Sequence, residues 1–310
     1  MSHSLPQVMR VYQNHHLDST RWDSFAPRED DIIIATSYKS GTTWMQTIVL
    51  NLIFGAKDVP SPVETARWLD NRANPLEDVI AHFEAQPHRR VIKTHLPLDG
   101  LPFYPDLKYI VVGRDGRDVF MSLWNHYKNY TPEGYAKFND TPGRVGSPVP
   151  ECPDDIRIFW HNWISRGWFE WDSEGYPFWS NFRHTQTWWN FRHLPNILFV
   201  HFNDLLKDLR GEVRRIAEFL NMPATGSRLA DVVEAATFST MKKNAEKIYP
   251  EAHLGFKGGA QTFINKGTNR RWEGFLGEEE MELYEDAVAR ELTLECALWL
   301  EFGHWQDQRT

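Results

Sequence analysis

The chain has 310 residues, with 34 Lys and Arg against 42 Asp and Glu, so its formal net charge is −8. This balance argues against a protein that coats nucleic acid, because such binding needs many cations facing phosphate, but it leaves room for one local basic pocket. Aromatic residues make up 14% of the chain and include 14 Trp, which is not the composition of a disordered chain. The length fits one large α/β domain or two small ones.

The chain shows no clear linker, and we predict a single domain over 1–310, with residues 1–30 as an N-terminal extension. Cys152 and Cys296 lie far apart, so they predict neither a disulfide framework nor a metal-ligand set. The polar stretch 1–27 lacks a basic segment followed by an apolar one, which predicts no secretory signal. The apolar runs are too short to span a membrane, and we expect a cytoplasmic protein.

The predicted elements alternate between strands and helices. Residues 31–36 form a β-branched apolar run, typical of a strand buried on both faces, and a small polar loop at 37–43 separates it from an apolar helix at 44–54. Further strands are predicted at 90–94, 108–113 and 196–200, and further helices at 119–130 and 210–220. The segment 130–153 holds five Pro and three Gly and is predicted to be a long loop. Four tryptophans that follow it are expected on one helix: Trp160, Trp163, Trp168 and Trp171.

This alternation predicts an α/β fold, with a central, mostly parallel sheet flanked by helices. In such folds the functional loops lie at the carboxyl ends of the strands. Three polar segments follow predicted strands in this way: 37–43, 95–97 and 114–118.

The first of these loops has the chemistry of a phosphate site. Gly41 allows the backbone to approach a ligand closely, and the first amides of the helix have no acceptor within it. Lys39 adds a charge, and the hydroxyls of Ser40, Thr42 and Thr43 add donors. A plain helix cap with Lys and Thr is the alternative, but the strand–loop–helix context favours a P-loop-like anion site.

The loop is not a Walker A motif, because Lys39 precedes Gly41 by two residues instead of following the last Gly. The nearest candidates for holding Mg²⁺ are Asp115 and Asp118, and both are flanked by arginines. An ordinary NTPase or kinase is therefore disfavoured.

Four segments resemble motifs of the cytosolic sulfotransferases. Residues 36–44 read T-S-Y-K-S-G-T-T-W, close to that family's donor loop T-Y-P-K-S-G-T-T-W, and 93–97 read K-T-H-L-P as in the family. Residues 114–122 keep the pattern R-x-x-x-D-x-x-x-S, and 265–272 keep part of R-K-G-x-x-G-D-W. The segments follow the family order.

The resemblance implies transfer of a sulfuryl group from 3′-phosphoadenosine 5′-phosphosulfate (PAPS) to a hydroxyl or an amine of a small acceptor, without a metal. Adenosine 3′,5′-bisphosphate is then the product. His95 resembles the general base, and Lys39 resembles the lysine that stabilises charge on the bridging oxygen. Lys93 would add positive charge beside the sulfuryl group. Ser122 resembles a serine that restrains the donor-loop lysine until an acceptor binds.

The same resemblance assigns residues to the nucleotide. Arg114 and Ser122 correspond to the pair that grips the 3′-phosphate, which leaves an Arg114 pairing with Asp115 or Asp118 as the alternative. Trp44 and Phe238 correspond to aromatics beside the adenine. Met241 lies in the segment of Phe238, and Phe202 stays undecided between core and ligand contact. Lys266 and the backbone amide of Gly267 would contact the 3′-phosphate.

The sequence departs from the family at Asn265, where the family has Arg, and either Arg270 or Arg271 could compensate. An acceptor pocket is expected near 60–68, 124–135 and the loop before Pro150, with Trp68, Trp124, Tyr127 and Tyr130 as its aromatic residues or as ordinary core. The tryptophans from Trp160 to Trp189 are expected in the core.

Two other functions are kept as alternatives: an ATP-dependent kinase on a related fold, and a non-catalytic binder of adenosine 3′,5′-bisphosphate. The presence of His95 and Lys39 argues against the second. No copy of the family's short C-terminal dimer motif is evident, so both a monomer and a homodimer stay open.

Overall fold

The computed structural model describes residues 4–304 and contains one sheet of four parallel strands in the order β2-β1-β3-β4. The strands are β1 (Ile32–Thr36), β2 (Val91–Thr94), β3 (Lys108–Gly113) and β4 (Ile197–His201). All of the strands that the sequence predicts are thus confirmed. In the register, Ala35 of β1 pairs with Thr94 of β2 and Val111 of β3, so three carboxyl ends lie side by side.

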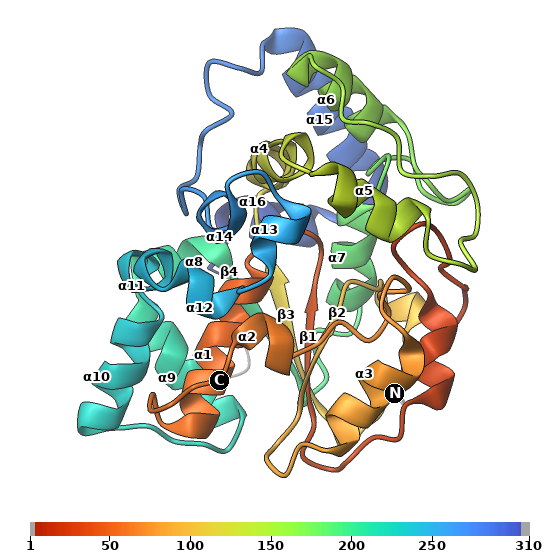
Figure 1. Cartoon of the computed structure of the whole chain (residues 1–310). Coiled ribbons are helices and arrows are strands. Elements are labelled where there is room, and N and C mark those ends of the chain that lie inside the picture. The colour runs from red at the N-terminus through yellow and green to blue at the C-terminus, as the bar shows by residue number, and fades with distance from the viewer. Residues whose placement is uncertain (1–3, 305–310) are drawn as a thin grey trace.

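The helices that surround the sheet are arranged in layers (Figure 1). Their bounds are η1 (Ser19–Ser24), α1 (Thr42–Phe54), α2 (Pro62–Thr65), α3 (Leu76–Glu84), η2 (Leu98–Gly100), α4 (Gly116–Lys128), α5 (Pro132–Asn139), α6 (Ile156–Ser165), α7 (Asn181–Trp189), α8 (Phe202–Lys207), α9 (Leu209–Phe219), α10 (Gly226–Ala235), α11 (Phe238–Lys243), α12 (Ala245–Ile248), α13 (Ala252–Gly255), α14 (Gly259–Phe263), α15 (Glu278–Glu291) and α16 (Leu294–Phe302).

Each face of the sheet belongs to a separate apolar core. Ile32 and Ile34 of β1 pack on the face covered by α1, α9 and α10, whereas Ile33 and Ala35 belong to the larger core on the other face (Figure 1). Alternate side chains of a strand point to opposite faces, so a strand covered on both sides must be apolar at every position. This explains the continuous apolar run in β1 and confirms the predicted α/β fold.

Two local predictions are wrong. Residues 132–139 form helix α5 inside the segment predicted to be a loop throughout. Thr131 caps this helix by accepting a hydrogen bond from the Gly134 amide, and Pro132 occupies the first turn, where proline fits a helix. Trp168 and Trp171 lie beyond the end of α6 at Ser165, so the four tryptophans do not share one helix.

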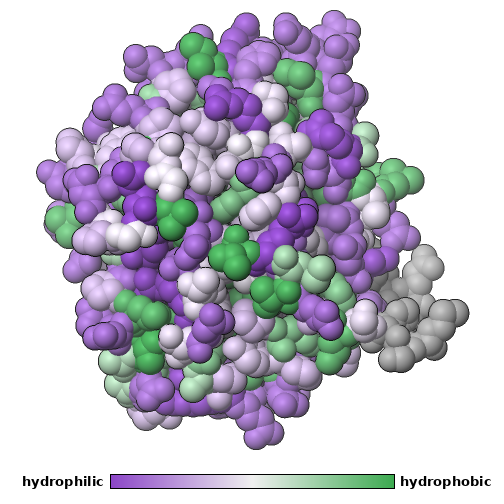
Figure 2. Space-filling view, turned by 90° about the vertical axis from the view of Figure 1, so that its right-hand side faces the viewer, coloured by the Kyte–Doolittle hydropathy of each residue, from purple (hydrophilic) through white to green (hydrophobic). Residues whose placement is uncertain are grey.

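The N-terminal segment is part of the core, with Tyr12, Leu17 and Trp22 at 0–1% exposure. Trp160, Trp163, Trp188 and Trp189 are buried as well, in agreement with the core packing expected for them, whereas Trp168 and Trp171 are only half-buried and Trp179 lines a cavity. The face shown in Figure 2 is largely hydrophilic, with apolar residues scattered over it. Within residues 4–304, no helix combines the length and the apolar character that crossing a membrane requires.

A buried ion pair lies at the amino ends of β1 and β2. Arg90, which precedes β2, donates from Nε to Oδ1 of Asp31 at 2.7 Å and from Nη2 to Oδ2 at 2.5 Å, and both side chains are at most 2% exposed. The guanidinium also lies 5.0 Å from the centre of the Phe25 ring. The pair therefore joins β1, β2 and the N-terminal segment.

We predict that Asp31→Asn lowers the free energy of unfolding by about 3–5 kcal/mol, because it leaves the Arg90 charge buried without its counter-ion. Urea denaturation measures the change. The control is Glu273→Gln, which breaks the Arg270–Glu273 pair at side-chain exposures of 77% and 45%. We expect it to change stability by no more than about 0.5 kcal/mol. Equal effects of the two substitutions would contradict a structural role for the buried pair.

Candidate active site

A cavity of about 300 Å³ lies at the carboxyl ends of the strands. It is lined by thirteen of the residues that the sequence singles out: Lys39, Gly41, Thr42, Thr43, Trp44, Lys93, His95, Arg114, Ser122, Phe238, Met241, Lys266 and Gly267. Ser40 is the exception among the predicted catalytic and donor-binding residues. Its side chain is buried, and its hydroxyl donates to the Tyr38 carbonyl at 3.4 Å.

Basic side chains dominate the charge of this cavity. Its described lining contains Lys39, Lys93, Arg114, Lys137, Lys266 and Arg271, and it includes no Asp or Glu. Arg114 is buried and Lys39, Lys93 and Arg271 are half-buried, whereas Lys137 and Lys266 are exposed. Removing cations from water without carboxylates nearby is costly unless an anion pairs with them. In a chain of net charge −8, such a cluster marks a site for an anionic ligand.

The loop after β1 places its amides and lysine by means of two left-handed residues. Lys39 has φ 58° and Gly41 has φ 116°, and Gly41 is the N-cap of α1. A Cβ on Gly41 would lie 3.2 Å from the Phe202 ring, so both the backbone angle and the close packing require glycine. The first amides of α1 consequently face the cavity end of the sheet, where an anion can accept from them.

Lys39 reaches across the cavity to α4. Its Nζ donates to Nδ1 of His126 at 3.3 Å and lies 4.7 Å from the centre of the Phe263 ring. Burial, together with the charges of Lys93 and Arg114, lowers the pKa of Lys39 to about 7. No Lys39–Ser122 hydrogen bond is present among the described residues, although Ser122 lies one helical turn before His126. The partner of the lysine in this state is therefore the histidine.

Lys93 is the second of these cations, at the end of β2. Its Nζ lies 4.6 Å from the centre of the Trp68 ring. Burial lowers the pKa of Lys93 to about 8, and the nearby charge of Asp70 opposes that shift. The pKa values of both lysines therefore lie close to neutral pH. A negative charge beside them would raise these pKa values and keep both side chains in the ammonium form.

His95 is held as a neutral base by the end of β1. Its Nδ1 lies 2.6 Å from the Thr36 carbonyl oxygen, and because a carbonyl can only accept, Nδ1 carries the proton. The other ring nitrogen, Nε2, then has a free lone pair. Burial and the charge of Lys93 lower the pKa of His95 well below its usual range, so the ring is neutral at pH 7.

Arg114 is directed toward the anion site by polar contacts that use backbone and amide oxygens. Its guanidinium donates to Asn269 Oδ1 at 3.0 and 2.8 Å, to the Thr268 carbonyl at 3.1 Å and to the Lys39 carbonyl at 3.2 Å. It also stacks on Phe202, 4.0 Å from the ring centre. These contacts use four of its five N–H groups, and all of the acceptors are uncharged oxygens, so no carboxylate neutralises the guanidinium.

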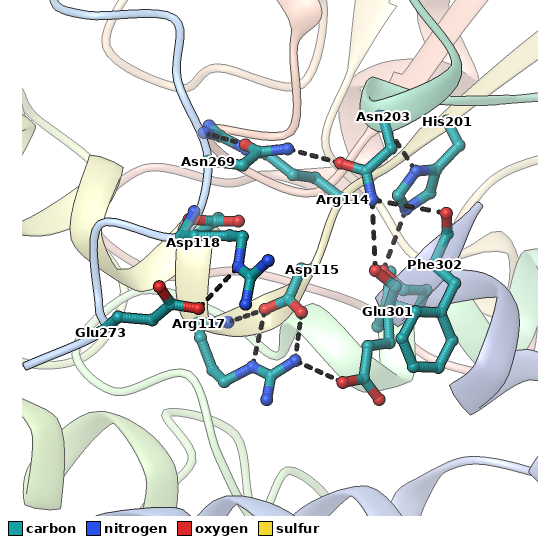
Figure 3. Close-up of polar contacts among 12 residues, drawn as sticks. Arg114, Asp115, Arg117, Asp118, His201, Asn203, Asn269, Glu273, Glu301 and Phe302 are labelled. Atoms are coloured by element: carbon teal, nitrogen blue, oxygen red, sulfur yellow. Dashed lines mark hydrogen bonds and ion pairs between the residues drawn. The ribbon is translucent and has the colours of Figure 1, made fainter. Parts of the chain in front are cut away.

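The two acidic neighbours of Arg114 have other partners (Figure 3). Asp115 forms an ion pair with Arg117, which also contacts Glu301, and Asp118 accepts from the Arg270 amide. Within residues 4–304 there is no ion pair between Arg114 and either aspartate, so the alternative pairing considered from the sequence is not observed.

Aromatic side chains form a slot beside the cations. Trp44 donates from Nε1 to the Ala236 carbonyl at 2.8 Å, which ties α1 to the segment that carries Phe238. Gly267 has φ 64°, and a Cβ there would lie 2.3 Å from the Phe238 ring, so the glycine backbone packs directly on that ring. Phe202 also lines the cavity, with its ring centre 5.1 Å from that of Trp44.

The far side of the cavity is lined mainly by rings. Trp68 and Tyr130 line it as expected for an acceptor pocket, whereas Trp124 and Tyr127 are absent from the lining and pack in or against the core. Of the two arginines that could replace the family Arg at position 265, Arg271 lines the cavity, and Arg270 pairs with Glu273 in solvent.

The sequence reasoning did not name a number of the lining residues, among them His16, His126 and Trp179. Of these, only His126 could have been predicted from the sequence, because it lies four residues after Ser122 and thus on the same face of α4. His16 and Trp179 come from segments whose positions depend on tertiary packing.

Comparison with known proteins agrees with this geometry. A family model described as the sulfotransferase domain matches residues 29–294. A glycolipid sulfotransferase of Mycobacterium bovis is 34% identical and aligns over 94% of both chains. Mouse sulfotransferase 2B1 is 31% identical over 85% of this chain and 71% of its own. The chain therefore belongs to the sulfotransferase family.

Solved structures share the fold. Mouse sulfotransferase SULT7A1, complexed with PAP, has a TM-score of 0.67 at 20% identity and covers 90% of this chain and 92% of its own. Retinol dehydratase, in complex with androsterone and inactive cofactor PAP, has a TM-score of 0.65 at 24% identity, with 89% of this chain and 84% of its own covered.

The depressed pKa values of the lysines predict a pH dependence of anion binding. Lys39, with its pKa at about 7, must be protonated to pair with an anion, and the anion raises that pKa. We therefore expect the Kd of adenosine 3′,5′-bisphosphate to rise at least tenfold between pH 7 and pH 9, with proton uptake on binding. Calorimetry in buffers of different ionisation enthalpy measures both. Lys39→Arg, which stays charged, should show a weaker dependence, and an unchanged profile would contradict the assignment.

Proposed function

We propose that the chain transfers a sulfuryl group from PAPS to a hydroxyl, or alternatively an amine, of a small hydrophobic or aromatic acceptor, and releases adenosine 3′,5′-bisphosphate (PAP). The observation that carries this proposal is the cluster of cations, unmatched by lining carboxylates, next to a neutral histidine with a free lone pair. The presence of PAP in the related SULT7A1 and retinol dehydratase structures supports it.

The residues of the cavity fit a donor of this kind. The amides and hydroxyls of 40–43 and the Lys39 ammonium suit the 5′-phosphosulfate end. For the 3′-phosphate, Arg114 retains one N–H and its full charge, and Ser122, Lys266 and the Gly267 amide lie in the same lining. Arg271 can supply the charge that Asn265 does not. Trp44 and Phe238 offer flat faces to the adenine, with Met241 beside them.

The bound donor supplies the sulfuryl group. The bridging oxygen, once its bond to sulfur is broken, leaves as part of PAP. His95 accepts the acceptor's hydroxyl proton on Nε2 while the acceptor oxygen forms a bond to sulfur. The bond between sulfur and the bridging oxygen breaks, and its electron pair stays on that oxygen. Lys39 and Lys93 stabilise the negative charge that develops there, and they do so in a site with little water.

The aromatic side of the cavity suits a hydrophobic acceptor. Trp68, Phe138, Phe178 and Trp179 line it near His95, with the Trp68 and Trp179 ring centres 4.7 and 5.5 Å from that of the histidine. An acceptor hydroxyl held between these rings would point at the base. A metal-independent reaction in a cytoplasmic protein remains our prediction, and EDTA should leave the turnover rate unchanged.

The kinase alternative predicts a different ligand. Lys39 is out of the Walker register, and an ATP γ-phosphate needs Mg²⁺ that the cation-lined cavity does not favour. We expect calorimetry to show tight binding of PAP and no heat from Mg-ATP. Tight binding of Mg-ATP without PAP binding would overturn the proposed function.

His95→Ala should reduce kcat by at least about 10³-fold, because the acceptor hydroxyl loses its base, while the Kd of PAP changes by less than threefold. Turnover is measured with labelled PAPS, and PAP binding by calorimetry. His88→Ala removes a histidine that packs on Phe54 outside the cavity and is expected to be as active as the wild type. Retained activity of His95→Ala would exclude His95 as the base.

Arg114→Met should raise the Kd of PAP by about 10²-fold or more, because a charge-assisted contact to phosphate is lost in a buried site. The matched ligand is adenosine 5′-phosphosulfate, which lacks the 3′-phosphate. Its weaker binding should be affected far less by this substitution. Equal losses for both ligands would place Arg114 away from the 3′-phosphate.

A further inference from the structure

Two adjacent histidines, His15 and His16, lie beside the cavity and have no role in the proposed transfer. Both are at most 2% exposed, and only His16 lines the cavity, with His15 behind it. The His16 ring stacks on Phe138, with ring centres 3.6 Å apart, and its edge faces Phe178 at 5.5 Å. Burying two polar rings in this aromatic wall is costly unless their nitrogens have partners.

The contacts of the pair determine which nitrogens carry protons. His15 Nε2 lies 2.8 Å from the Pro177 carbonyl oxygen and must donate to it. In a neutral His15 the lone pair is then on Nδ1, and this atom contacts Nδ1 of His16. His16 must therefore donate from Nδ1, which leaves its lone pair on Nε2.

The charge state agrees with this chain of hydrogen bonds. Burial lowers the pKa of His15 to about 3 and that of His16 well below its usual range, so both rings are neutral at pH 7. His95 is organised in the same way, with Nδ1 donating to the Thr36 carbonyl and Nε2 left as an acceptor. The Thr36 carbonyl thus fixes the acceptor nitrogen of His95, and the Pro177 carbonyl fixes that of His16 through His15.

The acceptor nitrogen of His16 has no partner. Nε2 is buried and receives no hydrogen bond from any residue of 4–304. Leaving a buried acceptor unpaired costs about 1–3 kcal/mol, which a donor on a bound molecule would recover. Among the rings around it, Phe138 and Phe178 have no donor, and Trp68 donates from Nε1 to Asp70. Trp179 has an Nε1–H that makes no hydrogen bond within residues 4–304, and none is formed with His16.

We propose that His16 binds a second hydroxyl of the acceptor, distinct from the hydroxyl that receives the sulfuryl group. The acceptor class is then a hydrophobic molecule with at least two hydroxyls, such as an aromatic diol or an alkyl-linked sugar. Both histidines line the same cavity, and the rings of Trp68 and Trp179 lie next to each of them. This inference rests on the proposed function and names the substrate class of the same site.

The test compares acceptors that differ only in the second hydroxyl. One pair is 2-naphthol and 2,7-dihydroxynaphthalene, and the other is 1-octanol and octyl β-D-glucoside, each assayed with labelled PAPS. We expect kcat/KM of the wild type to be at least tenfold higher for the polyhydroxyl member of a pair. Two equivalent hydroxyls alone would give a factor of about two in the naphthol pair.

His16→Phe keeps a ring against Phe138 and removes Nε2, so the ratio within a pair should fall to about two or less. His16→Gln, which restores an acceptor oxygen, should recover part of the ratio, and His88→Phe, outside the cavity, should keep it. Calorimetry on the PAP-saturated wild type gives a second measurement that needs no variant to fold. The dihydroxy compound should bind at least tenfold more tightly than 2-naphthol.

A wild type that transfers sulfuryl groups with no preference beyond twofold would overturn this inference and leave the proposed function intact. A His16→Phe variant that folds and keeps the full ratio would overturn it as well. Failure to transfer to any acceptor, with no PAP binding, would instead refute the proposed function and this inference with it.

Discussion

The gathering of positive charge at one edge of the sheet is the constraint on which the rest of the site depends. Lys39, Lys93 and Arg114 line one cavity without a lining carboxylate, and each has lost most of its water. The faces of Phe263, Trp68 and Phe202 compensate in part, but a cation–π contact contributes only about 0.5–2 kcal/mol, less than the several kcal/mol that desolvation of an ion costs. The part of the desolvation cost that the rings do not offset is removed when an anion binds. It therefore favours anion binding and lowers the stability of the ligand-free protein.

The fold tolerates this cluster of cations because the stability of the sheet does not depend on the cavity. The three cations follow or end β1, β2 and β3, which the register brings side by side. Each strand is buried on both faces by separate apolar cores, and the Asp31–Arg90 pair closes the opposite end of β1. Mutual repulsion of the cations therefore acts on strand ends that the sheet holds side by side.

The sequence was informative where a local pattern has one structural meaning. Four apolar residues in succession predict a strand covered on both faces, and the small polar loop after 32–36 predicts an anion site, so the sheet and the predicted donor residues of the cavity were found from the sequence. The helix at 132–139 was not predicted because the five Pro and three Gly of 130–153 were counted together, whereas Pro132 lies in the first turn, where proline is compatible with a helix. His16 and Trp179 could not be predicted to line the cavity, because nothing within their own segments determines which distant residues they meet.

Burial and the same positive field together determine the state of the base. An imidazolium at position 95 would lose its water and would also be repelled by Lys93 and Lys39, so His95 stays neutral in the donor-free enzyme. The carbonyl of Thr36, at the end of β1, decides which nitrogen keeps the lone pair. The cations that attract the donor thus hold the histidine ready to accept a proton, and the strand that ends in the anion loop orients it. When an anion neutralises part of that field, the pKa of His95 must rise, which makes the imidazole a stronger base only once the donor is in place.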